Sequence, residues 1–161
     1  MENETQRVAA EVVRRYSDAV YRLAFACVKN KTDADDVFQE VFLRYFGQPR
    51  EFESEEHRKA WLLRVTINCS RKLQNSAWFR RTSQLDEEEP VFDKPDENNL
   101  AQALARLKPK YRSVVHLFYY EDLSVKRIAE LTARTESHVR TLLTRARAQL
   151  KELLRGEYDD V

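Results

Sequence analysis

Apolar residues in the first half of the chain recur three or four positions apart, which is the spacing of amphipathic helices. One such stripe covers residues 9–28. A second follows the segment NKTDAD, in which Thr32 and Asp35 have the spacing of a capping box. After the breaking stretch GQPREFES, Ser54 is suited to cap a third helix that reaches about Gln74. The residues predicted to face inward in the second and third helices are Val37, Phe38, Val41, Phe42, Tyr45, Trp61, Leu62, Val65, Cys69 and Leu73.

The second half of the chain begins with a different pattern. Residues 82–97 are acidic, contain two prolines and show no periodicity, so we expect a flexible linker there. Beyond it, apolar spacing predicts a helix over residues 100–107 and another that begins at Pro109, because proline suits the first position of a helix. Ser124 then caps a short helix, and Thr135 caps a long final one.

The fold class that follows is all-α. We expect an N-terminal three-helix-type bundle in residues 8–81 and a C-terminal four-helix module with a helix-turn-helix in residues 98–155. The acidic linker of residues 82–97 joins the two, and residues 156–161 form an acidic tail. The scarcity of chain-breaking residues, 2 Gly and 4 Pro in 161 positions, agrees with long helices.

The chain has no signature of a membrane or secreted protein. No apolar run approaches the roughly 20 residues needed to span a bilayer. The N-terminal residues, MENETQRVAAEVVRR, are charged and lack the apolar core of a signal peptide. We therefore expect a cytoplasmic protein without membrane insertion.

Charge is distributed unevenly along the chain, although the formal net charge is only +1. Residues 57–81 carry 7 basic and no acidic side chains, and residues 126–155 carry 8 basic and 3 acidic ones. Between them, residues 82–100 carry 1 basic and 7 acidic side chains. Two basic segments predict two separate surfaces for a polyanion such as nucleic acid. The alternative is that both are solvated helix faces on which charges cluster by chance.

The final pair of predicted helices has the spacing of a DNA-binding helix-turn-helix. In the second of these helices, apolar residues gather on one side and small hydroxyl residues lie opposite, flanked by arginines. Small side chains let a helix sit deep in the major groove, while arginine reaches phosphates or guanine edges. The candidate DNA-binding residues are Thr135, Ser137, His138, Arg140, Thr141, Thr144 and Arg145. An ordinary amphipathic helix with a solvated polar face is the alternative, and His138 is equally well explained as a surface residue.

Catalytic and metal-binding chemistry has no support in the sequence. Cys27 and Cys69 stand apart from any other residue at metal-ligand spacing, so we expect both to pack in the core without a disulfide. There are no paired carboxylates near a histidine, no glycine-rich phosphate loop and no Cys-His arrangement. We expect no enzyme activity, no metal and no cofactor.

Three segments together resemble a known family. LKPKYRSVVHLFYYEDLSVKRIAELTARTESHVRTLLTRARAQLKELL is similar to region 4 of the small extracytoplasmic-function (ECF) sigma factors, the bacterial RNA polymerase subunits that select promoters. DADDVFQEVFLRYF resembles their region 2.2, and KAWLLRVTIN resembles regions 2.3 to 2.4. Because these segments occur in family order, the chain is identified as a member from about Val12 to Leu154.

The resemblance implies that the chain binds core RNA polymerase, through the β′ clamp helices and the β flap, and promoter DNA. An anti-sigma factor is a further candidate partner. The implied polymerase-binding residues are Asp35, Asp36, Gln39 and Glu40. An acidic helix face can pair with basic side chains of a partner helix. Acidic residues are also favoured at a helix N-terminus by the dipole, so a solvated face is the alternative.

The resemblance also implies that the acid-free segment melts the −10 promoter element and captures an unstacked base. The implied residues are Lys59, Arg64, Asn68, Arg71 and Lys72. Cations contact the backbone, while the Asn68 amide can both donate to and accept from a base edge. We expect Trp61 to pack in the core, and Trp78 and Phe79 to pack at the helix end, with stacking on bases as the alternative for the latter two. The hydroxyl-rich face of the last helix would read the −35 element.

The chain departs from the family pattern at four positions. Ala133 and Arg134 replace a glycine and an apolar residue in the turn, and Ile67 and Leu142 occupy positions that are often basic. Leu142 lies at the apolar edge of the last helix, where we consider a contact to a thymine methyl, with packing in the core as the alternative. The alternative function is a helix-turn-helix transcriptional regulator that does not act as a polymerase subunit.

Overall fold

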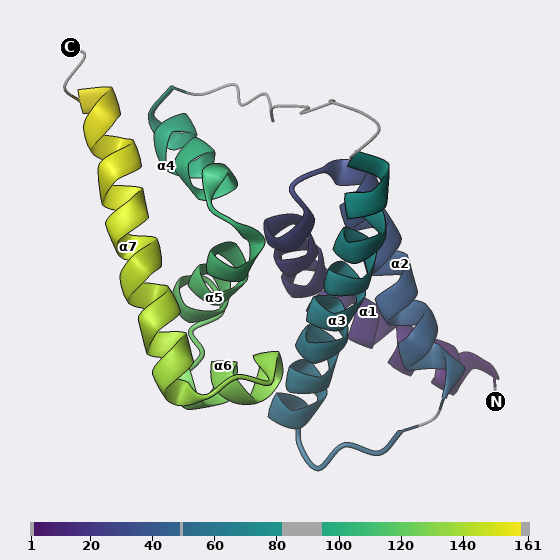
Figure 1. Ribbon diagram of the computed structural model, residues 1–161. Coiled ribbons are helices and arrows are strands. Elements are labelled where there is room, and N and C mark those ends of the chain that lie inside the picture. The colour runs from purple at the N-terminus through teal and green to yellow at the C-terminus, as the bar shows by residue number, and fades with distance from the viewer. Residues whose placement is uncertain (1, 49, 82–94, 159–161) are drawn as a thin grey trace. The chain divides into compact units, whose positions relative to one another are not determined.

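The computed structural model describes residues 2–48, 50–81 and 95–158, and these form α-helices joined by short connections (Figure 1). The helices are α1 (Glu2–Val28), α2 (Lys31–Gly47), α3 (Glu55–Arg81), α4 (Pro95–Arg106), α5 (Pro109–Tyr119), α6 (Val125–Thr132) and α7 (Glu136–Tyr158). The chain divides into a first unit, Met1–Gln84, and a second unit, Leu85–Val161. The predicted all-α fold class is confirmed.

The first unit is a bundle in which α1, α2 and α3 each contact the other two. Its centre contains Val20 and Leu23 from α1, Val41 from α2 and Leu62 from α3, all fully buried. Both cysteines belong to this core and are free thiols. The apolar spacing of the sequence therefore identified the inward face of all three helices.

The connection between α1 and α2 differs from the predicted one. Lys29 adopts the left-handed conformation (φ 66°) and its backbone N–H donates to the Phe25 carbonyl, which ends α1. Asn30 is then the N-cap of α2, because its side-chain oxygen accepts a 2.8 Å hydrogen bond from the Asp33 backbone N–H. The predicted capping box of Thr32 and Asp35 is wrong, since both residues already lie within the helix.

Ser54 caps α3 as expected, because its hydroxyl accepts a 3.1 Å hydrogen bond from the His57 backbone N–H. Three helix ends, however, lie outside the predicted bounds. Helix α3 continues to Arg81, and α4 begins at Pro95, inside the predicted linker. Helix α7 continues to Tyr158, inside the predicted tail. Helix α3 extends past Gln74 because no proline or glycine interrupts it before Arg81, and α4 begins at a proline, which suits the first position of a helix. The side chains of residues 77–99 and 156–161, and hence the predicted roles of Trp78 and Phe79, lie outside the described residues.

In the second unit, α4, α5 and α6 all contact α7 (Figure 1). Fully buried residues from three of these helices, Val114, Ile128 and Val139, form the core together with Leu107, which follows α4. Helix α7 is thus the helix against which the other three pack, and the face of α7 that contacts none of them is exposed to solvent.

The helix-turn-helix is formed by α6, a short turn and α7. Ala133 ends α6 in the left-handed conformation (φ 54°, ψ 44°), and its backbone N–H donates to the Ala129 carbonyl. Thr135 caps α7, because its hydroxyl accepts a 3.1 Å bond from the His138 backbone N–H. Alanine therefore adopts here a backbone conformation that glycine, which has no Cβ, adopts more readily.

No helix within the described ranges is long and apolar enough to cross a membrane.

Replacing Ala133 by glycine should stabilise the second unit. The left-handed conformation costs a non-glycine residue about 1–2 kcal/mol. Glycine loses about 0.5–1 kcal/mol more conformational entropy on folding, so the net gain is roughly 0.5–1 kcal/mol. Urea unfolding of the full chain, followed by circular dichroism, measures it. Ala148→Gly is the matched control, since this exposed residue lies within α7 and the change should cost about 1 kcal/mol. Equal destabilisation by both substitutions would contradict the prediction.

Candidate nucleic-acid and partner interfaces

The outward side of α2 combines acidic, amide and apolar side chains. Asp36, Gln39 and Glu40 are exposed there, and so are Leu43 (68%) and Phe46 (48%). We call these five residues the α2 ridge. Large exposed apolar side chains next to polar ones are typical of protein interaction sites.

Asp35 does not share the orientation of the α2 ridge. It is half-buried on the side of α2 that faces α1, with Lys31 Nζ 3.3 Å from its carboxylate. Burial, and secondarily the charge of Asp35, raises the pKa of the Tyr21 hydroxyl on α1. Three of the four predicted polymerase-binding residues therefore lie together, whereas Asp35 helps to hold α1 against α2.

Glu40 lies on the flank of the α2 ridge nearest α3. Its Oε1 is 2.9 Å from Nε of Arg44. Burial raises the pKa of the Cys69 thiol on α3, and the charges of Arg44, Glu40 and Lys72 act on the same thiol. Because both partners of the Glu40–Arg44 pair are half-exposed, the pair itself adds little to stability.

Leu43 and Phe46 are interface candidates that the sequence reasoning missed. The segment VFLRYF is apolar on several sides of the helix, and Leu43 and Phe46 fall outside the inward set Val41, Phe42 and Tyr45. Their position outside the inward stripe was the sequence signal that could have identified them as interface candidates.

A basic and amide face runs along α3. Arg64, Asn68 and Lys72 are exposed at successive intervals of four residues, which places them on one side of the helix. Arg71 is half-buried beside them. We call these four residues the α3 face. Ile67 is only 2% exposed, so this family departure packs in the core and presents no side chain on the α3 face.

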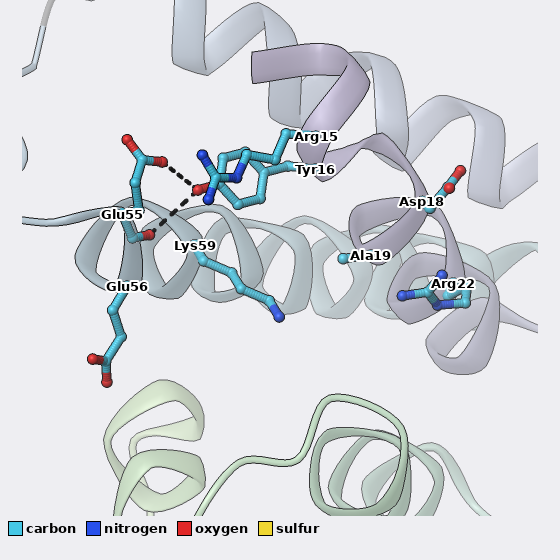
Figure 2. Close-up of a pocket in the computed structure, with 8 residues that line it drawn as sticks. All are labelled: Arg15, Tyr16, Asp18, Ala19, Arg22, Glu55, Glu56 and Lys59. Carbon is cyan, nitrogen blue, oxygen red and sulfur yellow. Dashed lines mark hydrogen bonds between the residues drawn. The ribbon is translucent and has the colours of Figure 1, made fainter. Parts of the chain in front are cut away.

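Lys59 lies elsewhere. It lines an open groove of about 540 Å³ between α1 and the start of α3 (Figure 2). The charged residues of that groove are Arg15, Arg22, Lys59, Asp18, Glu55 and Glu56. Cations and carboxylates balance there, so the groove has no excess charge that would attract a phosphate backbone. The structure does not bring Lys59 together with the other predicted −10 residues.

The same groove contains the hydrogen bond that ties α1 to the beginning of α3. The Tyr16 hydroxyl donates to a carboxylate oxygen of Glu55 and lies 3.5 Å from the Glu55 backbone carbonyl (Figure 2). Burial raises the pKa of Tyr16 to about 12, and the hydrogen bond and charge of Glu55 add to the rise.

Trp61 belongs to an aromatic cluster rather than to the centre of the bundle. It is partly exposed, and its ring centroid lies 5.9 Å from that of Tyr45 and 6.0 Å from that of Phe52. The Arg50 guanidinium carbon is 4.8 Å from the Trp61 ring centroid. Since Trp61 precedes Arg64 by one turn, this cluster extends the α3 face towards the α2–α3 connection.

The outward side of α7 presents hydroxyl groups with free acceptor capacity. Thr141 Oγ1 donates to the Ser137 carbonyl (3.1 Å), and Thr144 Oγ1 donates to the Arg140 carbonyl (2.9 Å). Each hydroxyl thus uses its hydrogen on its own helix and keeps lone pairs for an outside donor. The amino groups of adenine and cytosine are such donors in the major groove.

Charged side chains flank these hydroxyls. Arg140, Arg145 and His138 are all exposed. Ser137, Thr141, Thr144, Arg140 and Arg145 define what we call the α7 face. Thr135 is exposed at the start of the helix, where its hydroxyl serves as the cap.

Leu142 is not available to DNA. It is 1% exposed and packs in the core of the second unit with Val139 and Leu143. The contact with a thymine methyl is therefore wrong, because the Leu142 side chain points into the core, although Thr141, the residue before it, lies on the hydroxyl side. An arginine at this position would place a charge in the core.

The family follows from comparison with known proteins. Residues 12–80 match the model of sigma-70 region 2, and residues 97–150 match that of sigma-70 region 4. The RNA polymerase sigma-E factor of Streptomyces coelicolor is 33% identical over 155 residues, which cover 89% of this chain and 84% of that protein. This chain belongs to the ECF sigma factor family. The sigma factor SigV of Bacillus subtilis is 29% identical over 152 residues, 88% of each chain.

Two solved structures share the fold. CnrH, solved with the cytosolic domain of CnrY, is 25% identical with a TM-score of 0.67, over 94% of this chain and 90% of CnrH. The sigma factor RpoE of Bartonella quintana, solved with the anti-sigma factor NepR, has a TM-score of 0.74 at 17% identity, over 96% of this chain and 98% of RpoE. The α2 ridge and the α3 face lie in the region 2 match, and the α7 face lies in the region 4 match.

Tyr16→Phe should reduce the loss of stability at alkaline pH. The folded state holds the Tyr16 proton up to a pKa of about 12, whereas the unfolded state releases it near the ordinary value of 10.0. The stabilisation from this group is complete below pH 10 and is lost as the pH rises towards 12. Urea midpoints of the full chain, compared below and above pH 10, measure the difference.

Tyr45→Phe is the control, because it removes one tyrosine without altering the Tyr16–Glu55 hydrogen bond. If Tyr16→Phe loses as much stability above pH 10 as the wild type, the buried Tyr16 hydroxyl does not have this role.

Proposed function

We propose that the chain is a promoter-specificity subunit of RNA polymerase in which each of three outward helix faces has its own partner. The α2 ridge binds the clamp helices of the β′ subunit, the α3 face binds the −10 element, and the α7 face reads the −35 element. The observation that carries the proposal is that the α2 ridge, with its exposed acidic and apolar side chains, and the basic α3 face occur in the same unit, the one that matches sigma-70 region 2.

The chemistry of the α2 ridge suits a basic helical partner. Leu43 and Phe46 provide apolar area that a partner can cover, and such central apolar contacts supply most of the affinity. Asp36 and Glu40 beside them favour cationic side chains and set the register and rate of association. The β flap is a second contact that we propose for the chain.

The α3 face suits a strand whose bases are separated. Arg64, Arg71 and Lys72 can track the phosphate backbone, and the exposed Asn68 amide can pair with the edge of one base. The aromatic cluster around Trp61, at one end of this face, offers partly exposed rings for stacking. Asn68 and Trp61 are therefore the residues that we propose for base capture. Lys59, which lines the charge-balanced groove, has no part in this proposal.

The α7 face suits duplex DNA. Its central hydroxyls are short enough to let the helix enter the major groove, and Arg140 and Arg145 flank them within reach of phosphates or guanines. We assign His138 to the rim of this face and Thr135 to a structural role as the cap.

An anti-sigma factor is a further partner that we propose. The support is that the sigma factor RpoE, which shares the fold, was solved with the anti-sigma factor NepR, and that the exposed apolar residues of the α2 ridge can be covered by a partner. A regulator that acts without joining the polymerase is less favoured, because a region 2 unit has no part in that mode of action. We assign no catalytic role to any residue.

Charge reversal on the α2 ridge should weaken binding to core RNA polymerase. Asp36→Lys together with Glu40→Lys replaces attraction by repulsion of a basic partner, and we expect affinity to fall by at least about tenfold, or about 1.4 kcal/mol. Titration of labelled full chain with core polymerase measures it. Glu4→Lys with Glu11→Lys on the exposed side of α1 is the control with the same charge change. Unchanged affinity of the ridge variant, with normal circular dichroism, would remove the docking assignment.

Asn68→Ala should impair promoter opening more than initial binding, because an amide that holds an extruded base contributes only once the strands have separated. Open-complex formation, measured by permanganate reactivity with the reconstituted holoenzyme, should fall, while closed-complex affinity changes by less than about twofold. Asn75→Ala is the control, since this exposed asparagine lies on the same side of α3 nearer its end. A primary loss of closed-complex affinity would assign Asn68 to structure or duplex binding.

A further inference from the structure

Arg147 is held in place by an aromatic side chain from another helix. Its Nε donates a 2.7 Å hydrogen bond to the hydroxyl of Tyr119, at the end of α5. Its guanidinium carbon also lies 5.7 Å from the ring centroids of both Tyr119 and Phe118. Arginine stacked on aromatic rings keeps its charge while losing much of its freedom. Yet both Arg147 and Tyr119 are exposed, so the arrangement is at the surface and not in the core.

The position of Arg147 on α7 relates it to the α7 face. It follows Arg140 by seven residues, which is about two turns, so the two arginines lie along the same flank about 10 Å apart. Arg147 is also about 16 Å along the axis from Glu136, the first residue of α7. The major groove is only about 12 Å wide, so a side chain this far along a helix that enters by its N-terminus meets the groove edge rather than the bases.

The chemistry of the remaining donors fits a phosphate. Tyr119 occupies Nε, which leaves the two terminal nitrogens with four N–H groups. Among the residues whose side chains are described, no carboxylate pairs with Arg147. An exposed guanidinium with a fixed orientation and two outward nitrogens is suited to bidentate recognition of a phosphate.

We infer that Arg147, oriented by Tyr119, binds a backbone phosphate of the −35 duplex at the edge of the major groove. Tyr119 is a positioning residue in this pair, since it acts through Arg147. The inference rests on the proposed binding of duplex DNA by the α7 face and adds two residues to it. A phosphate contact is indifferent to base sequence, so the pair contributes affinity and register but no sequence preference.

The test measures how DNA binding by the reconstituted holoenzyme depends on salt. The probe is a labelled duplex with the −35 sequence that the wild-type holoenzyme enriches from a random library. Arg147→Ala should lower the slope of log affinity against log salt concentration by about one unit and weaken binding to all enriched sequences equally. Arg147→Met should do the same while it keeps an aliphatic stem against the rings. Tyr119→Phe keeps the charge and the ring but not the hydrogen bond, and should weaken binding a few-fold with a slope near that of the wild type.

Lys110→Ala is the matched control. Lys110 is an exposed cation held over the Tyr111 ring at 5.1 Å, at the opposite end of α5 from Tyr119, so the same charge is lost away from the α7 face. An unchanged salt slope in both Arg147 variants would overturn the inference and leave the pair as a link between α5 and α7. An equal change of slope in Lys110→Ala would overturn it too, since any lost cation would then suffice. Failure of the wild-type chain to confer DNA binding on core polymerase would instead overturn the proposed function.

Discussion

Burial of one face of each helix determines which residues the opposite face can display. Val41 on α2, Leu62 on α3 and Val139 on α7 are fully buried, and the register of each helix around these residues sets its outward side. The α2 ridge, the α3 face and the α7 face are those outward sides. A substitution that rotates or loosens one of these helices would therefore disturb binding without touching a contact residue. The orientation of these faces depends on core packing more than on the Glu40–Arg44 ion pair, since this pair at the α2 ridge is half-exposed and weak.

The outward faces differ in chemistry although the chain carries almost no net charge. The α2 ridge joins acidic groups to exposed Leu43 and Phe46, a composition suited to a protein partner. The α3 face has cations and an amide with aromatic rings at one end, and the α7 face has hydroxyls between arginines. Under the proposed function, separation of these chemistries onto different helices gives the protein partner, the opened strand and the duplex each a face of its own. Net charge would have concealed this arrangement, whereas charge counted by segment indicated it.

Periodicity predicted the elements well because burial dominates their placement, and it failed where local geometry decides. The inward stripes were correct for Val41 and Leu62, yet the start of α2 was misassigned because Asn30, not Thr32, has the extended backbone of an N-cap. Lys59 belongs to a basic segment of the sequence, but in the fold it lies in the charge-balanced groove beside Tyr16, which the segment's charge could not predict. For Leu142, at the apolar edge of the last helix, the sequence allowed either a DNA contact or core packing, and the structure shows that the side chain is buried. The Tyr119–Arg147 pair joins residues 28 positions apart, which no local pattern reveals.

Joined to core RNA polymerase, the chain should make the enzyme selective for promoters. Transcription of fragmented genomic DNA by core polymerase, with and without the purified chain and with transcript 5′ ends mapped, tests it most directly. We expect a small set of discrete start sites that appear only when the chain and core polymerase are both present and that are preceded by two shared sequence elements. Start sites that are the same with and without the chain, together with DNA binding by the chain that needs no polymerase, would contradict it.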